Sequence, residues 1–179
     1  RSLEADVKKA WMAFSLAAWL AAPAWAFDVA VTPLQIGLGG EKVQLFSPET
    51  RVMGLRLNTV FSENRDVMGL DVGFFSLSDR TTAIQLNLAN WVEAEFVGVS
   101  AGLFSTMGSV SGLQAGIFNT AEHDLNGFQI GVFNSADDVS GFQVGLVNRT
   151  VSLRGIQVGL VNIVEAGPVT FFPIVNAAF

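Results

Sequence analysis

The chain has 179 residues, a net charge of −6 and no cysteine, and half of its residues are hydrophobic. The missing cysteine excludes disulfides, thiolate metal sites and cysteine nucleophiles. The few, scattered basic residues give no basis for nucleic-acid binding. We therefore expect one domain, apolar enough that association with a membrane has to be considered.

Residues 1–26 have the pattern of a secretory signal peptide. Two lysines precede a short apolar run, residues 10–22, and an A-x-A triplet occupies residues 24–26. This order predicts export and cleavage after Ala26. The alternative is a buried or membrane-anchoring helix, although the apolar run is short for a membrane span. Residues 27–179 are then expected to form a single domain.

The segment from residue 27 to 53 is expected to form a hairpin outside the repeat described next. A loosely alternating strand from Phe27 to Leu38 precedes a turn signal at residues 39–42 and a short returning strand from Val43 to Phe46. Because proline cannot donate to a ladder, Pro33 predicts an edge position or a bulge in the first strand.

From Gly54 to about Pro168 the chain is a tandem repeat of 14 or 15 residues with the pattern G-x-Q-x-G-φ-φ-N, where φ is apolar. We number each copy from its leading Gly or Ala. Positions 2, 4, 6 and 7 are mainly apolar, position 3 is polar, position 5 is usually Gly, and position 8 is usually Asn or Ser. The period-two alternation predicts a strand of about ten residues and a turn of about four. The copies begin at Gly54, Gly69, Ala83, Gly98, Gly112, Gly127, Gly141 and Gly155.

Our first prediction is an all-β fold, an antiparallel up-and-down β-barrel of about 10–12 short strands in an outer membrane. Positions 2, 4 and 6 would face lipid, and position 3 would form a polar ring inside, where Arg56 and Asp71 could pair. The near-alternation of 14- and 15-residue copies suggests the two kinds of turn of a hairpin array. The final strand, residues 169–179, ends in Phe179, which resembles the C-terminal signal of outer-membrane barrels. The position-3 residues are Arg56, Asp71, Gln85, Ser100, Gln114, Gln129, Gln143 and Gln157.

The alternative prediction is a parallel β-solenoid, in which each copy is one coil and identical residues stack as Gln and Asn ladders. Positions 2, 4 and 6 would form its interior, and position 7 would leave an exposed Phe stripe that needs a partner. The turns at residues 122–124 and 137–138 would stack on one edge of a solenoid but lie at opposite rims of a barrel. The absence of Tyr and the single Trp after residue 26 favour the solenoid, since membrane barrels carry aromatic girdles. The Phe stripe comprises Phe75, Phe104, Phe118 and Phe133.

The repeat copies, the segments at residues 54–58 and 64–73, and the ending FPIVNAAF resemble one bacterial family. It is the surface-repeat family of small secreted proteins with tandem GLQxGLxN units. The resemblance covers essentially all of residues 27–179 and implies an exported protein at the cell surface or outer membrane, with no catalytic residues to carry over. Asn58 and Asn87 depart from the family pattern, because they replace the second Gly.

No catalytic constellation is evident, and we predict a protein that is not an enzyme and has no cofactor or metal. The only histidine, His123, lies in a predicted polar turn and would need metal ligands from other turns. The pairs Asp137-Asp138 and Glu93/Glu95 suggest calcium, but their spacing matches no known loop. The triplet at residues 148–150 matches a glycosylation acceptor.

The expected location is the outer membrane or cell surface of a Gram-negative-type bacterium. The expected partners are the lipid bilayer and its insertion machinery, and the expected role is structural, pore-like or surface display. The solenoid alternative would instead be attached to the surface and bind a partner through its Phe stripe.

Overall fold

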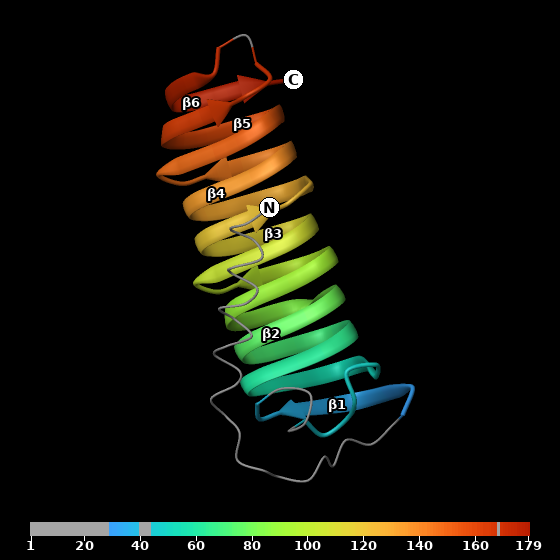
Figure 1. Cartoon of the computed structure of the whole chain (residues 1–179). Helices are drawn as coiled ribbons and strands as arrows, with labels where there is room; N and C mark the ends of the chain where they lie inside the picture. Colours follow the sequence, from blue (N-terminus) through green and yellow to red (C-terminus); the bar gives the residue numbers. More distant parts are fainter. Residues whose placement is uncertain (1–28, 40–43, 168) are drawn as a thin grey trace, which may run out of the picture.

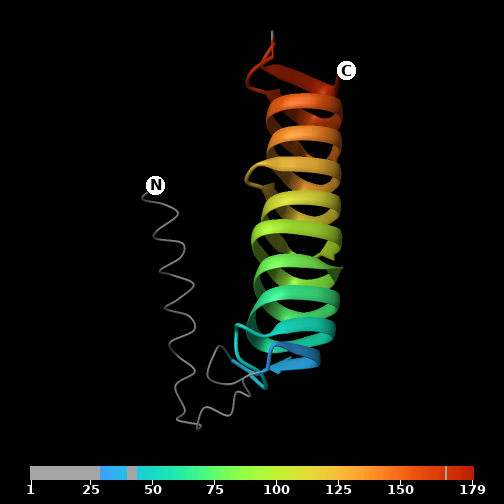
Figure 2. The ribbon, with the colours of Figure 1, turned by 90° about the vertical axis from the view of Figure 1, so that its right-hand side faces the viewer.

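The computed structural model describes residues 29–39, 44–167 and 169–179, and these form a rod of stacked coils, a β-solenoid (Figure 1). The predicted signal peptide lies outside the described residues. The perpendicular view shows the same stack of coils along the rod (Figure 2). The strands pair in chain order within one sheet: β1 (Val31–Gly37), β2 (Arg51–Ala101), β3 (Phe104–Ala121), β4 (Asp124–Val144), β5 (Val147–Val164) and β6 (Phe171–Ala178).

Consecutive coils run in the same direction. β3 pairs in parallel with β4, which places Gly112 beside Gly127, and β4 pairs in parallel with β5, which places Gln143 beside Gln157. β2 pairs in parallel with both β1 and β3. The predicted all-β class and the solenoid alternative are confirmed, whereas the antiparallel barrel is wrong.

The two acidic turns stack on one edge of the rod. The amides of Asp137 and Asp138 both donate to the carbonyl oxygen of His123 at 3.0 Å, directly from one coil to the preceding one. The register of β2 against β3 shifts between Val92 and Glu95, so the extra residue of a 15-residue copy is absorbed at this edge. The difference between 14- and 15-residue copies therefore comes from a local bulge at this edge. The prediction of two kinds of hairpin turn is wrong.

β1 starts the stack and carries the bulge expected at Pro33. The register between β1 and β2 shifts between Thr32 and Leu34, which confirms that proline interrupts the ladder there. The predicted turn that follows lies largely outside the described residues. The returning segment contributes an isolated antiparallel bridge from Gln44 to Gly37.

β6 ends the stack by running antiparallel to β5, with Asn176 opposite Gln157. The register is irregular between Gly159 and Asn162. Phe179 follows the end of β6 and is 98% exposed. Phe179, which resembles the C-terminal signal of a barrel, thus lies at the end of an antiparallel strand that covers the last coil of a solenoid.

Over positions 1–8 the interior of the rod is polar and the exterior is apolar. Gln129 and Asn134 are fully buried, while Phe128, Ile130 and Phe133 are exposed. This is the orientation expected for the barrel, although the strands are parallel. The expectation that a solenoid would bury positions 2, 4 and 6 is wrong, because the stacked amides satisfy one another inside the coil and the strand alternation sends their apolar neighbours outward.

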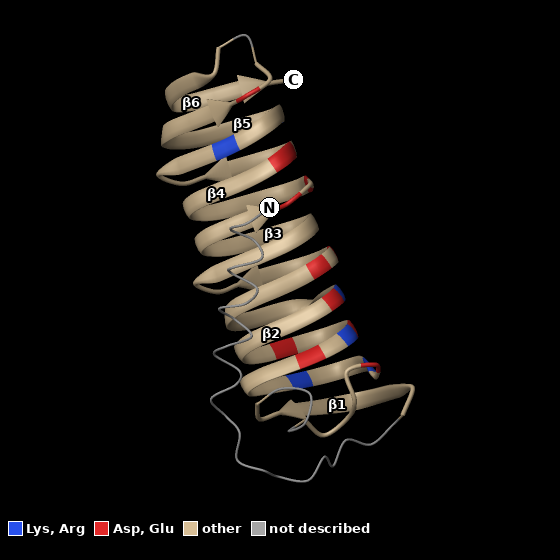
Figure 3. Cartoon of the chain, in the orientation of Figure 1, with Lys and Arg blue, Asp and Glu red and all other residues tan. Residues whose placement is uncertain are grey.

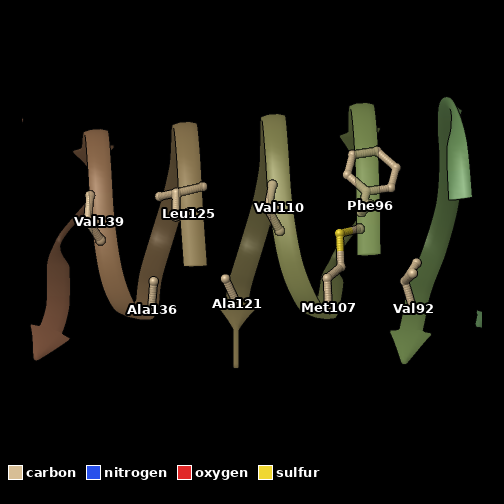
Figure 4. Close-up of a cluster of buried hydrophobic side chains, with 8 residues drawn as sticks. All are labelled: Val92, Phe96, Met107, Val110, Ala121, Leu125, Ala136 and Val139. Carbon is tan, nitrogen blue, oxygen red and sulfur yellow. The ribbon is translucent and has the colours of Figure 1, made fainter. Parts of the chain in front are cut away.

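A small apolar core lies inside the coils next to the acidic turns (Figure 4). Its side chains come from inward positions on either side of each turn, including the apolar residues two before the next copy. The interior is therefore divided into a polar part under the apolar exterior and an apolar part under the charged edge. The cluster comprises Val92, Phe96, Met107, Val110, Ala121, Leu125, Ala136 and Val139.

Candidate functional site

The position-3 residues form one buried column along the rod. Gln35 of β1 extends this column, because it pairs in register with Arg56. Gln35 could not be predicted from the repeat, because the segment before residue 54 contains no recognisable copy of it. All eight position-3 residues are 0% exposed: Arg56, Asp71, Gln85, Ser100, Gln114, Gln129, Gln143 and Gln157.

The last four residues of this column form a glutamine ladder. The Nε2 of Gln129 donates to Oε1 of Gln114 at 2.8 Å. Gln143 donates to Gln129, and Gln157 to Gln143, at the same distance. The remaining Oε1 of Gln157 accepts from Nδ2 of Asn176 at 3.3 Å, so β6 closes the acceptor end of the ladder. Each coil thereby fixes the register of the next.

A second ladder runs along position 8, which the sequence analysis did not count among the site residues. Asn119 donates from Nδ2 to Oδ1 of Asn134 at 2.9 Å, and the same contact links Asn134 to Asn148 and Asn148 to Asn162 at 2.8 Å. These amides donate toward the C-terminus, whereas the glutamines donate toward the N-terminus, so the two rows of side-chain dipoles oppose each other. Asn148 is 0% exposed, and the predicted glycosylation acceptor is therefore enclosed in the folded chain.

The first coils replace the glutamines with a buried ion pair. Both Nε and Nη2 of Arg56 donate to the carboxylate of Asp71, at 3.0 and 2.7 Å, and both side chains are 0% exposed. Burial by itself raises the pKa of Asp71. The charge of Arg56 and hydrogen bonds from Arg56, Ser76 and Gln85 outweigh burial and hold that pKa below its ordinary value.

Two asparagines that depart from the repeat pattern also bind this carboxylate. Asn58 and Asn87, at position 5, donate from Nδ2 to Asp71 at 2.6 and 3.1 Å. Where other copies have Gly at position 5, these two copies have side chains that complete the coordination of the buried charge. The Asn residues and the ion pair therefore belong to one polar cluster.

The two ladders are interrupted at one coil, where serine occupies both positions 3 and 8. Asn90 donates to Ser100 Oγ at 3.2 Å and to Ser105 Oγ at 3.4 Å. On the other side of this coil, Oδ1 of Asn119 is buried and has no hydrogen-bond partner in the structure. Serine is too short to reach it, so the asparagine ladder starts with an unsatisfied acceptor.

Ser105→Asn is expected to stabilise the protein by about 1 kcal/mol, because the new Nδ2 can donate to Oδ1 of Asn119 and the new Oδ1 can accept from Asn90. Ser140→Asn makes the same change at an exposed site and is expected to alter stability by less than about 0.5 kcal/mol. Equilibrium unfolding in denaturant measures both effects. A loss of stability in Ser105→Asn would show that this coil has no room for the amide.

On the exterior, three residues of the expected Phe stripe stack face to face. The ring centroids of Phe104 and Phe118 are 5.3 Å apart, and those of Phe118 and Phe133 are 5.4 Å apart. Phe75 is half-buried, and Ala89 separates it from the other three along position 7. We therefore restrict the Phe stripe to the three stacked residues Phe104, Phe118 and Phe133.

The Phe stripe belongs to a wider apolar exterior that the sequence analysis had assigned to the interior of a solenoid. Phe128 and Phe142 at position 2 stack with ring centroids 5.1 Å apart. Leu146 and Leu160 at position 6 are 51% and 66% exposed. We define the apolar exterior as positions 2, 4, 6 and 7 of the eight copies, which run side by side along the rod.

The exposed charges lie outside the apolar exterior. Within positions 1–8 of the eight copies the only charged residues are Arg56 and Asp71, both buried. Most of the other charges follow one edge of the rod, on the right in Figure 3. We call this edge the charged edge. Ion pairs among the exposed charges include Arg149 with Glu165, at 2.7 Å, and Arg51 with Asp66, at 3.0 Å.

The residues examined for metal chemistry lie apart from the buried columns. Glu122, His123 and Asp124 are exposed at the charged edge, as are Asp137 and Asp138. Among the described residues no group of three or more His, Cys, Asp or Glu side chains is arranged to hold a metal ion. In the part of the chain that the structure covers, no helix is long and apolar enough to cross a membrane.

Comparisons with protein-family models, with curated proteins and with solved structures found no match for this chain. The resemblance to the GLQxGLxN surface-repeat family therefore stays a prediction.

Proposed function

We propose that the chain is an exported, non-enzymatic β-solenoid that is attached to a cell surface or outer membrane and acts by binding through its apolar exterior. The observation that carries this proposal is the inverted arrangement of side chains: amides fill the interior while rows of Phe, Leu, Ile and Val face outward. Apolar patches larger than a few hundred Å² usually mark interaction sites. The eight copies rise about 38 Å at a strand spacing of about 4.8 Å, and the five residue-to-residue steps from position 2 to position 7 span about 17 Å, which gives roughly 600 Å².

The burial and hydrogen bonding of the interior polar groups favour a binding role over catalysis. The glutamines and asparagines of the two ladders donate to each other and to backbone carbonyls, and they are fully buried. They therefore stabilise the stack and are not available to contact a substrate. The same packed columns leave no place for the pore that a barrel would have offered, so the pore-like role is not part of this proposal.

Export is supported by the sequence of residues 1–26, whose basic start, short apolar run and A-x-A triplet fit a secretory signal. A protein with this exterior would be prone to association in any aqueous compartment. Attachment to an apolar surface soon after export would remove that exposure, because covering apolar area is favourable by about 25 cal/mol per Å².

The test is fractionation of a Gram-negative host that expresses the full chain. We expect the protein to be exported, to sediment with membranes and to be released by detergent but not by high salt, because the attachment is apolar. The variant Phe104→Ser/Phe118→Ser/Phe133→Ser is expected to shift largely to the soluble exported fraction. The matched variant Glu122→Ser/Asp124→Ser/Asp138→Ser changes three exposed residues of the charged edge and should remain with the membranes. Soluble recovery of the parent protein would contradict the proposal.

A further inference from the structure

We infer that the occupant of the apolar exterior is a lipid layer, and that the rod lies on its side in the interface of one leaflet with the charged edge in water. This inference rests on the proposed function and names the partner. Its first support is the shape of the surface. The chain bends at Gly102–Leu103 and Gly145–Leu146, so position 6 lies at a corner of the coil, with positions 2 and 4 before the corner and position 7 after it.

A corner that is apolar on both sides suits a fluid partner. A flat protein surface, or a second copy with the same convex corner, would cover one side and leave the other exposed to water. Acyl chains can follow the contour and cover both sides together. All four corner leucines are exposed, from 42% for Leu103 to 66% for Leu160, so their side chains are free to enter a lipid layer.

The backbone at this corner is ready for an environment without water. In a bilayer each unpaired N–H or C=O group costs several kcal/mol, so spanning or embedded structures must satisfy them internally. Here the amide of Leu103 donates to the carbonyl of Leu88 at 2.8 Å, that of Leu146 to Val132 at 3.0 Å, and that of Val161 to Leu146 at 2.9 Å. The coil-to-coil ladder therefore continues through the corner, and contact with lipid leaves these groups paired.

The charges define which side faces water. Outside the buried ion pair, the described residues include eleven Asp or Glu and five Arg. This acidic excess gives no attraction to anionic head groups, and it lies away from positions 1–8. The apolar exterior can enter the lipid while the charged edge stays hydrated, which is the arrangement of amphipathic structures that lie in a membrane interface.

Trp91 marks the boundary between the two surfaces. It is half-buried at position 9, between the apolar position 7 of its coil and the acidic residues Glu93 and Glu95. Tryptophan prefers the head-group level of a bilayer, where its ring is in an apolar layer and its N–H can reach water. In the proposed orientation Trp91 occupies this level, and it can report the depth of the rod.

The experiment uses the full chain with Trp11, Trp19 and Trp25 replaced by Phe, which leaves Trp91 as the only tryptophan. The protein is mixed with neutral phosphatidylcholine vesicles and with vesicles that also contain anionic phosphatidylglycerol, and binding is measured by flotation. We expect binding to neutral vesicles, no increase with anionic lipid, and a blue shift of Trp91 fluorescence. Quenching should be stronger with bromine near the head groups than with bromine deep in the acyl chains.

Two variants with equal added charge locate the contact. Leu103→Asp/Leu146→Asp places carboxylates at the corner of two separated coils and is expected to weaken vesicle binding at least tenfold. Thr82→Asp/Ser152→Asp adds the same charge at exposed sites outside the apolar exterior and should bind within about twofold of the parent. If the first variant loses its strand circular-dichroism signal, Leu103→Ser/Leu146→Ser replaces it, with a smaller expected loss in the same direction.

The outcomes separate this inference from the proposed function. Failure of the folded parent to bind neutral vesicles, together with dimers or larger assemblies that the corner variant dissociates, would overturn the lipid assignment and leave the apolar exterior as a protein-binding surface. Equal vesicle binding by the corner variant and its control would also overturn it. A parent that binds no vesicles, does not self-associate and does not sediment with membranes would overturn both.

Discussion

Asp71→Asn is expected to destabilise the protein by about 3–5 kcal/mol, because it leaves the guanidinium of Arg56 buried without a countercharge. Arg56→Gln leaves the carboxylate of Asp71 buried without a countercharge and should destabilise the protein by a similar amount. The double variant Arg56→Gln/Asp71→Gln is expected to lie within about 1 kcal/mol of the parent protein, since a buried ion pair can often be exchanged for neutral residues of similar size. The double substitution also joins Gln35 to Gln85 in one uninterrupted column.

Equilibrium unfolding of the four proteins gives a double-mutant cycle, and the expected coupling energy is several kcal/mol. Additive losses in the double variant would show that the stacked geometry, and not charge pairing, stabilises these coils. A second readout is pH. The folded-state pKa of Asp71 lies below its ordinary value, so the stability that it contributes is present above that ordinary value and is lost as pH falls through the folded-state pKa. The double variant lacks this group and should lose less stability than the parent in that acidic range.

The repeat made the local structure predictable. Strict alternation around position 3 indicates an extended chain with Gln129 on one side and Phe128 and Ile130 on the other, and the structure has this arrangement. The direction of neighbouring strands was not predictable from alternation, because parallel and antiparallel strands have the same period of two. The barrel was favoured because Phe179 resembles the C-terminal signal of outer-membrane barrels and because the copy lengths nearly alternate between 14 and 15 residues.

The sequence did contain a signal for the parallel arrangement. Five of the eight copies carry Gln at position 3 and Asn at position 8 in the same phase, and parallel stacking brings both into register, with Gln143 beside Gln157 and Asn134 beside Asn148. In the antiparallel barrel position 3 would still meet position 3 at mid-strand, whereas the Asn at position 8 would meet a different position of the repeat. The acidic turns carried no such signal in the sequence, and their place on one edge follows from the structure, where the amide of Asp137 donates to the carbonyl oxygen of His123 in the preceding coil.

Other parts of the site could not be read from the repeat. Gln35 belongs to the position-3 column although its own strand contains Pro33 and no copy of the motif. The roles of Asn58 and Asn87 depend on Asp71, which lies one coil away from each of them, so only the three-dimensional stack explains why Gly is replaced there. Side chains that depart from a repeat are explained by their neighbours along the stack.

Gly127→Ala is expected to destabilise the solenoid by about 3 kcal/mol, which combines backbone strain with overpacking. Gly127 has a φ of 136°, a conformation that alanine rarely adopts, and it lies beside Gly112 in the adjoining coil. A Cβ at this position would overlap the carbonyl oxygen of Gly112, a backbone atom that is fixed by the parallel ladder. To avoid this overlap the two coils would have to separate, and that separation would also lengthen the hydrogen bonds of the Gln and Asn ladders.

Ala83 provides the matched control, because it occupies the same repeat position without a positive φ. Ala83→Gly is expected to cost only about 0.5–1 kcal/mol, from the greater freedom of glycine in the unfolded chain. Thermal and denaturant unfolding of both variants would test the difference. A cost for Gly127→Ala no greater than that for Ala83→Gly would mean that the coil can adopt the backbone of the Ala83 copy, and that close stacking at position 1 does not require glycine.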